Sequence, residues 1–299
     1  MNKVVTARKN VFRKTAKRSR ASKGFNIAIS IFWMVLIAFF VLFPFYILFV
    51  TSIMAPEESH NANFKFWPDS PSFESYYQVL FEGKGGHSIP RSFLMTFLFY
   101  LPPSIVGVII CSIAAFAFAK MNFKAKKWMF AILLGSMMVP NTMSLIISYL
   151  IYDQLYWIDT PLPIMIPRLF GTASIVFFLR QYYMKIPNDL LDSAKIDGMG
   201  WWSIFWRLIF PISLPAIVAQ FILYFITGYN DYLGPLLYLQ SSEFETLQLA
   251  LANYRDPYYQ NWPLRMAACI VAMIPMIVLY LASQKTIMKD MSVGSGIKG

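Results

Sequence analysis

The chain has 299 residues, of which 57% are hydrophobic and only 14% charged, and its 26 basic and 15 acidic residues give a formal net charge of +11. Soluble proteins are about 45–50% apolar and about 25% charged, so this composition excludes a soluble globular protein as well as a disordered or collagen-like one. Cys111 and Cys269 lie far apart in apolar segments, which excludes a disulfide framework and a cysteine-rich zinc site.

A basic arm opens the chain. Residues 1–23 hold nine of the basic residues, and a charge-free run from Gly24 to Pro56 follows. This run is too long for the apolar part of a signal peptide and has no small-residue cleavage site, so it predicts a retained first membrane helix. Beside such a helix, the arm is interpreted as an orientation signal near anionic lipid, and we expect no nucleic-acid partner.

Long apolar runs organise the rest of the chain. Each charge-free run can cross about 30 Å of hydrocarbon as a helix. The runs are Gly24–Pro56, Ser92–Ala119, Trp128–Tyr152, Leu208–Asn230 and Met266–Gln284. A sixth segment, Thr160–Leu179, contains Arg168, and hydropathy alone leaves it the weakest of the six.

The distribution of Lys and Arg decides whether the sixth segment crosses the membrane. With six spans, 20 of the 26 basic residues fall on one side, in the arm, the 120–127 loop, the 180–207 loop and the tail from Lys285. Without that span, the basic tail would lie on the opposite side, against the positive-inside rule. The sequence therefore predicts an all-α integral membrane protein with six transmembrane helices and both termini cytoplasmic. Its parts are the arm 1–23 and a six-span domain 24–299 that ends in a cytoplasmic tail, 285–299.

Two outer segments are long enough to carry structure. The first, Ala55–Arg91, contains PDSPSFESYY, and its Pro and Ser punctuation predicts a small ordered external cap. The second lies between Asn230 and Arg265 and is too polar to enter lipid. We expect it to re-enter the membrane region or to line a cavity, where polar backbone is tolerated.

The sequence offers little for catalysis. His60 and His87 are the only histidines, both lie in the first external segment, and they are interpreted as exposed loop residues rather than metal ligands. GKGGHS at Gly83–Ser88 lacks the first glycine of a P-loop at the right spacing, and neither a G-x-S-x-G elbow nor a Cys/His pair on one side of the membrane is present. We expect no catalytic residue, no metal and no cofactor bound by this chain.

Charges inside the spans are also scarce. Arg168 and Asp231 are the exceptions, both near the external ends of their spans, and they are interpreted as interfacial residues that reach water. Ion-coupled carriers place ionisable residues within their helices, so this pattern disfavours a proton or sodium relay. Energy for transport must then enter in another way.

The cytoplasmic segment IPNDLLDSAKIDGMGWWSIFWRLIFPISLPA, Ile186–Ala216, has the pattern of a helix, a turn and a second helix. Asn188 can cap the first helix, and Gly198 permits a sharp turn before Trp201. Leu190, Leu191 and Ala194 share one face of the first helix. The residues after the turn are too hydrophobic for a solvated loop and predict contact with a partner protein or the membrane boundary. They are Trp201, Trp202, Ile204 and Phe205.

About residues 186–206, this segment resembles the EAA loop of ABC transporter permeases. Asp192, Ser193 and Ala194 stand at the E-A-A positions, with Asp in place of Glu and Ser in place of the first Ala, which preserves charge and small size. The resemblance implies a coupling helix that docks into a groove on a separate ATP-binding subunit. The coupling residues that it implies are Asp192, Ser193, Ala194, Asp197, Gly198, Trp201, Phe205 and Pro211.

Further matches resemble the carbohydrate-uptake branch of these permeases, which includes the second membrane subunit of the maltose importer. They are LRQYYMKIPNDL, YNDYLGPLLYL from Tyr229 and the tail KDMSVGSGIKG from Lys289. The resemblance implies the type I ABC importer permease fold in a bacterial or archaeal cytoplasmic membrane. It also implies that Gly294, Ser295 and Gly296 reach between the ATPase subunits, although composition alone would fit a frayed terminus as well.

The expected function is therefore that of a permease subunit in a binding-protein-dependent importer for a carbohydrate, with an oligosaccharide favoured. The resemblance implies a second permease as heterodimer partner, two ATP-binding subunits that hold ATP and Mg²⁺, and an extracytoplasmic solute-binding protein. Alternating access would move the coupling helix around Gly198.

Tyr229, Asn230 and Asp231 are the candidates for the substrate path. The alternative roles for these three residues are contact with the binding protein or a cap on the polar outer segment. An ABC permease for a polyol or a peptide, and a stand-alone secondary carrier, remain alternative functions.

Overall fold

The structure, a computed structural model, describes residues 27, 29–59, 65–83, 88–254 and 261–295. All regular secondary structure in these ranges is helical. Four helices are long and apolar enough to cross a membrane, and a bent helix pair brings the number to five if it forms one span. The described part of the chain thus confirms an all-helical membrane protein, but it does not contain six uninterrupted spans.

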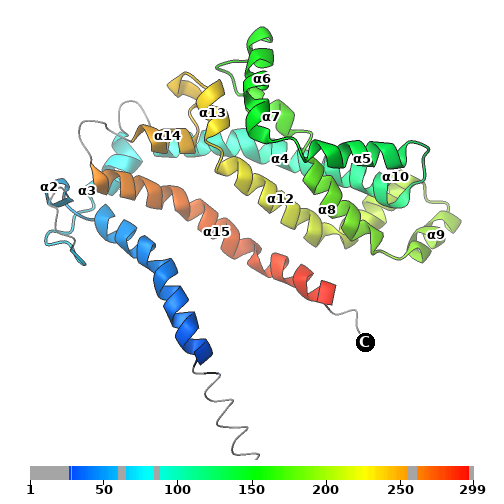
Figure 1. Cartoon of the computed structure of the whole chain (residues 1–299), viewed down its shortest axis with the longest axis horizontal. Helices are drawn as coiled ribbons and strands as arrows, with labels where there is room; N and C mark the ends of the chain where they lie inside the picture. Colours follow the sequence, from blue (N-terminus) through cyan, green and yellow to red (C-terminus); the bar gives the residue numbers. More distant parts are fainter. Residues whose placement is uncertain (1–26, 28, 60–64, 84–87, 255–260, 296–299) are drawn as a thin grey trace, which may run out of the picture.

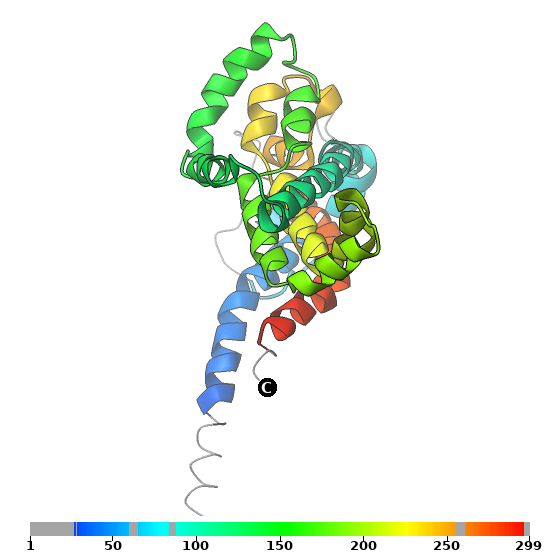
Figure 2. The same ribbon diagram turned by 90° about the vertical axis from the view of Figure 1, so that its right-hand side faces the viewer.

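The first membrane helix, Ile29–Ser52, leaves the bundle over most of its length, as Figure 1 and Figure 2 show. Its apolar side chains are largely exposed, and only its outer end is buried, at Val50 and Ser52. The Ser52 hydroxyl lies 2.7 Å from the Tyr76 hydroxyl and so ties this end to the external segment. The exposed stretch must meet lipid or another protein in a membrane.

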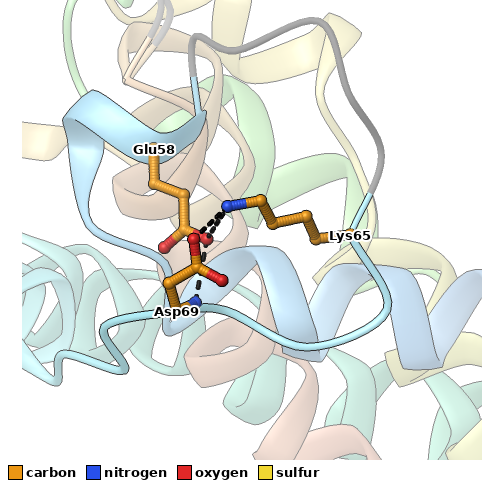
Figure 3. A network of polar contacts seen from close by, with 3 residues as sticks. All are labelled: Glu58, Lys65 and Asp69. Carbon is orange, nitrogen blue, oxygen red and sulfur yellow. Dashed lines mark hydrogen bonds and ion pairs between the residues drawn. The ribbon is translucent and has the colours of Figure 1, made fainter.

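The small ordered cap predicted for residues 55–91 is present over its described residues. It contains the short helices α2 (Pro56–Ser59), α3 (Glu74–Tyr77) and η1 (Gln78–Glu82). Glu58 accepts hydrogen bonds from the Asp69 amide (2.9 Å) and the Lys65 ammonium (3.3 Å), and Lys65 also contacts Asp69 (Figure 3). The Asp69 amide and the Lys65 charge lower the pKa of Glu58, because both stabilise its charged form. His60 and His87 lie outside the described residues.

The 32-residue helix α4 (Ile89–Lys120) is the central element. Its buried face carries many small residues, which allow close helix approach. They are Ser92, Thr96, Ser104, Gly107, Cys111, Ser112 and Ala115. The helices α8 (Ala173–Met184), α12 (Leu214–Tyr229) and α7 (Leu162–Arg168) pack against α4.

The predicted third span, Trp128–Tyr152, is not one helix. It is divided between α5 (Lys126–Ser136) and α6 (Asn141–Gln154), and α6 projects away from the bundle in both views (Figures 1 and 2). Pro140, directly before α6, has no amide to donate to the Ser136 carbonyl, which ends the helical hydrogen-bond ladder there. Most apolar side chains of α5 and α6 are exposed.

The predicted fourth span is confirmed as α7 and α8, which together cover Leu162–Met184. It is interrupted between Arg168 and Ala173, where Gly171 adopts φ +67°. A Cβ at Gly107 of α4 would lie 2.5 Å from the Arg168 carbonyl oxygen and 3.0 Å from the Gly171 nitrogen. The glycine therefore lets α4 pack directly against the interruption.

The fifth predicted span begins with a sharp bend. The segment after helix α9 (Asn188–Ile196) runs through α10 (Trp201–Ile204), η2 (Phe205–Ile209) and α11 (Phe210–Ile212). It then turns by 77° into α12. Pro211 and Pro215 lack the amides that would bond to the Arg207 and Pro211 carbonyls, which explains a break at Ser213 between them.

The outer segment after α12 folds back onto the bundle. It contains α13 (Leu233–Tyr238), η3 (Ser242–Phe244) and α14 (Leu247–Asn253). The Leu247 amide donates to the Thr96 hydroxyl of α4 at 2.8 Å, and the Ser241 amide donates to Asp159 at 2.8 Å. These hydrogen bonds tie the segment to α4 and to the turn before α7.

The last helix, α15 (Trp262–Ser295), packs against α12 and continues past the predicted end of the sixth span at Gln284.

Two clusters of buried residues divide the core along α4 and α12. One cluster joins Phe99 and Tyr100 of α4 to α12, α14 and α15. The other cluster joins Phe116 and Phe118 of α4 to α8, α9, η2 and the start of α12. α4 thus takes part in both clusters. Figure 1 shows α4 running along the long axis of the molecule.

Candidate functional site: a cytoplasmic coupling helix

The helix predicted for the coupling loop is α9, which lies at one end of the long axis, together with α10 (Figure 1). Its inner face buries Leu191 and Ala194 in the core cluster around Phe116 and Phe118 of α4. Its outer face exposes Ser193, Asp197 and Leu190, and Ile196 is 87% exposed; Asp192 is exposed at the edge of this strip, where it also lines the cavity beside α4. The strip carries large apolar side chains among polar ones and is a candidate docking surface for a protein.

The start of α9 differs from the prediction. Asn188 is its first helical residue, and no side-chain hydrogen bond caps the helix. The Asn188 side chain instead accepts a hydrogen bond from the Lys120 ammonium, at 2.8 Å. Local sequence favours Asn188 as a capping residue, but its side-chain oxygen is instead bonded to Lys120 at the end of α4.

The predicted turn at Gly198 is confirmed. Gly198 has φ +78°, its amide donates to the Lys195 carbonyl at 3.0 Å, and the Met199 amide donates to the Ala194 carbonyl at 3.0 Å. These paired bonds form a Schellman motif, in which a glycine just beyond the helix adopts the left-handed conformation. The motif fixes the direction in which the chain leaves α9 toward α10.

The aromatic residues after the turn divide between the core and the surface. Phe205 and Ile204 are fully buried, and the Phe205 ring lies 5.5 Å from that of Phe116. Their hydrophobicity is therefore explained by the chain's own core, so the expectation of a partner for them is wrong. Trp201 is partly covered, with the Lys195 ammonium 4.5 Å from its ring centre, and Trp202 remains 64% exposed.

The remaining coupling residue, Pro211, lies in the bend before α12 rather than on the docking strip. It connects the coupling segment to a membrane helix.

The substrate-path candidates at the outer end of α12 have different environments. Tyr229 is only 2% exposed, and its hydroxyl donates to the Ala272 carbonyl of α15 at 2.7 Å, so it packs between helices. Asn230 is exposed. The half-buried Asp231 accepts bonds from the Tyr100 hydroxyl (3.1 Å) and the Gly234 amide (3.2 Å).

Arg168 is partly exposed and lies among side chains of neighbouring helices. Its guanidinium lies 4.0 Å from the ring centre of Tyr224 and 5.1 Å from that of Tyr100. Its Nε donates to the Ser104 hydroxyl at 3.0 Å, and its terminal amino group donates to the Tyr224 carbonyl. Tyr100 in turn reaches Asp231. We call Arg168, Tyr100, Ser104, Tyr224 and Asp231 the arginine cluster, and it joins α7, α4 and α12.

The arginine cluster and the Lys120 contact were not predicted from the sequence. An arginine within an apolar run was a usable signal, because charge at membrane depth persists mainly where it has partners. Nothing in the sequence showed which tyrosine, serine or carboxylate would be those partners, since they come from segments about 60 residues apart or more.

The predicted tail contact falls partly outside the described residues. Gly294 and Ser295 belong to the last turn of α15, and Gly296 is not described. Within the described residues, no three His, Cys, Asp or Glu side chains come together as a group that could hold a metal ion.

Comparison with known proteins places this geometry in a family. Residues 92–293 match the model of the binding-protein-dependent transport system inner membrane components. The chain is 30% identical over 277 residues to the arabinooligosaccharides transport system permease protein AraQ of Bacillus subtilis, covering 92% of this chain and 96% of the relative. It is 28% identical over 258 residues to the melibiose/raffinose/stachyose import permease protein MelC of the same organism, covering 86% and 91%.

A solved structure has the same fold. A chain of a bacterial ABC transporter involved in the import of the acidic polysaccharide alginate superposes with a TM-score of 0.77 at 20% identity, covering 89% of this chain and 97% of that chain. The family match includes α4 through nearly all of α15, and with them the coupling helix α9. The chain therefore belongs to the binding-protein-dependent transport system inner membrane components, the multi-pass permeases of ABC transporters.

Proposed function

We propose that this chain is one membrane subunit of a binding-protein-dependent ABC importer for a carbohydrate, in particular an oligosaccharide. The similarity to AraQ and MelC, whose names give oligosaccharide substrates, supports this substrate class. The chain forms half of the translocation path, and a second permease forms the other half as a heterodimer. An extracytoplasmic solute-binding protein delivers the sugar to the outer face.

Energy enters through two separate ATPase subunits, which bind ATP and Mg²⁺. The observation that carries this part is α9, whose outer face is an exposed acidic and apolar strip, while Leu191 and Ala194 on its inner face lie in the same core cluster as α4, α8 and α12. A force applied to α9 by an ATPase subunit therefore acts directly on the membrane helices. The tail adds a second contact with the ATPase subunits, because Gly294, Ser295 and Gly296 reach between them.

The proposed topology has six crossings with both termini in the cytoplasm of a bacterium or archaeon. The broken pair α5 and α6 supplies the third crossing, once the second permease covers its exposed apolar residues. Asn230 and Asp231 lie on the substrate path at the outer end of α12, whereas the burial of Tyr229 supports a packing role.

Purification from the native membrane in mild detergent, with mass spectrometry and an ATPase assay, tests the proposal. We expect a second permease and a P-loop ATPase to co-purify, and hydrolysis to rise when binding protein loaded with raffinose, lactose or an arabinooligosaccharide is added. Ile196→Glu, which places a charge on the docking strip, should remove the ATPase subunit from the eluate. Lys124→Glu, in the cytoplasmic loop outside α9, is the matched control and should retain it.

Purification of the chain without any ATPase, together with solute transport by vesicles that contain only this chain, would establish a stand-alone carrier instead. Stimulation by a polyol or a peptide, but by none of the sugars, would keep the importer and change its substrate class.

A further inference from the structure

The cytoplasmic end of α4 is joined to the coupling helix by one polar side chain. Lys120 is the last residue of α4, and its ammonium donates to the Ile186 carbonyl at 2.6 Å and to the Asn188 side chain at 2.8 Å. Ile186 follows α8, and Asn188 begins α9. A single cation therefore connects three helices, and hydrogen bonds from a charged donor are about twice as strong as neutral ones.

The contact spans a gap rather than a packed interface. A polar cavity of about 260 Å³ separates this face of α9 from the end of α4. Its lining consists of Ala119, Lys120, Asn122, Asn188, Leu191, Asp192 and Lys195. Beside the cavity, Leu191 and Ala194 supply the apolar contact of α9 with the core. The Lys120 side chain thus provides a polar connection between α4 and α9 at the edge of this cavity.

The other half of α4 is joined to the outer end of the bundle. Ser104 accepts a hydrogen bond from Arg168 of α7, and Tyr100 donates to Asp231 at the end of α12. Gly228 of α12 lies so close that a Cβ there would overlap Tyr100 and Arg168. The arginine cluster therefore holds α4, α7 and α12 in one relative position.

Between these two connections, α4 has the geometry of a stiff rod. Its internal prolines are Pro102 and Pro103, so the stretch from Ser104 to Lys120 keeps an unbroken hydrogen-bond ladder. Sixteen steps at about 1.5 Å per residue make this stretch roughly 24 Å long. A displacement of its cytoplasmic end is then transmitted to Ser104 with little loss of amplitude.

We propose that Lys120 is a positioning residue that passes the movement of the coupling helix α9 to α4, and that α4 carries this movement to the arginine cluster at the outer end of α12. The inference rests on the proposed function, because it requires an ATPase subunit that moves α9. It adds a mechanical route within this chain, with named residues at both ends.

The test uses the complete importer in lipid nanodiscs, with Tyr232→Cys at the outer end of α12 as a reporter in a background where Cys111 and Cys269 are alanine. The rate of its labelling by a soluble maleimide is measured with and without ATP and vanadate, which holds the ATPase subunits closed. With Lys120 present, closure should change the rate by about fivefold or more, the low end of typical coupling between distant sites.

Lys120→Met keeps the apolar stem and removes the donor. We expect the ATPase subunits to remain bound and to hydrolyse ATP, while the labelling response falls below about twofold. Lys120→Arg, which restores a donor, should recover part of the response. Lys126→Met is the matched control and should respond fully, because the Lys126 ammonium at the start of α5 donates to the Met121 carbonyl and so joins the end of α4 to α5 rather than to α9.

An unchanged response in Lys120→Met would overturn the route while leaving the importer intact. Loss of the ATPase subunits from both Lys120→Met and Asn188→Leu would show that the contact only maintains structure, and would also overturn it. If the unaltered complex neither hydrolyses ATP nor responds, the proposed function itself fails and the route fails with it.

Discussion

At the scale of single residues, close helix contacts in this protein depend on glycines where backbones touch. Gly107 of α4 faces the interruption between α7 and α8, where a Cβ would lie 2.5 Å from the Arg168 carbonyl oxygen. The neighbouring atoms are backbone and cannot rotate away. Gly171, across the contact, has φ +67° and faces the Cys111 sulfur. The position of Arg168, and with it that of the arginine cluster, therefore depends on the absence of a Cβ atom at Gly107.

Gly107→Ala should destabilise the protein by about 1–3 kcal/mol, because the added methyl group forces α4 away from the interrupted span. Gly135→Ala is the matched control, since nothing lies within 4 Å of a Cβ at that position of α5. Thermal unfolding of the purified variants in one detergent measures the difference. Equal midpoints for Gly107→Ala and the unaltered protein would show that α4 and the interrupted span are not tightly packed.

At the same scale, the sequence indicated that Arg168 is unusual but did not predict its surroundings. A charge near the end of an apolar run is commonly an interfacial residue, and no local signal distinguishes this from a cation enclosed by neighbouring helices. The two tyrosine rings and the Ser104 hydroxyl that surround Arg168 come from α4 and α12. Only their assembly supplies the partners of this half-buried guanidinium.

At the scale of elements, the coupling segment shows how far local sequence determines structure. The helix, the glycine turn and the second helix lie where the pattern predicted them, because a Schellman motif depends on a few adjacent residues. The spans Trp128–Tyr152 and Leu208–Asn230 are broken or bent, because prolines at 140, 211 and 215 remove amide donors that hydropathy does not register.

Gly198→Ala should loosen the end of α9, because an L-residue in the left-handed region costs roughly 1–2 kcal/mol. Nothing lies within 4 Å of a Cβ at Gly198, so this effect is conformational and not steric. Gly200→Ala, two residues away at φ −72°, is the control. Hydrogen exchange of the Met199 amide, which bonds to Ala194, should become faster in Gly198→Ala only. Equal exchange in both variants would contradict the role of the turn.

At the scale of the whole molecule, the bundle has a large incomplete surface. The first helix and the pair α5 and α6 expose most of their apolar side chains, whereas α4, α8 and α12 form the buried centre. The first helix and α6 extend away from that centre (Figures 1 and 2). This arrangement fits a subunit whose outer helices are covered by lipid and by a partner permease, as proposed above.

The proposed orientation predicts opposite labelling at the two ends of the bundle. In the background without native cysteines, Glu74→Cys on the external cap should react with an impermeant maleimide in intact cells, because the cap lies outside. Asp189→Cys on α9 should react only in inverted membrane vesicles. Reaction of both positions from the same side would refute the six-crossing topology and favour an even number of crossings between them.

The sequence by itself determined that the protein is an all-α membrane protein, where most of its apolar helices lie, and where the helix–turn–helix of the coupling segment falls. These features follow from composition, from the length of apolar runs and from residues adjacent in the chain.

The tertiary structure alone decided that Phe205 belongs to the core, that Lys120 reaches Asn188, and that Arg168, Tyr100 and Asp231 form one cluster. These contacts join segments far apart in sequence. Their geometry is set by helix packing, which composition and local pattern do not specify.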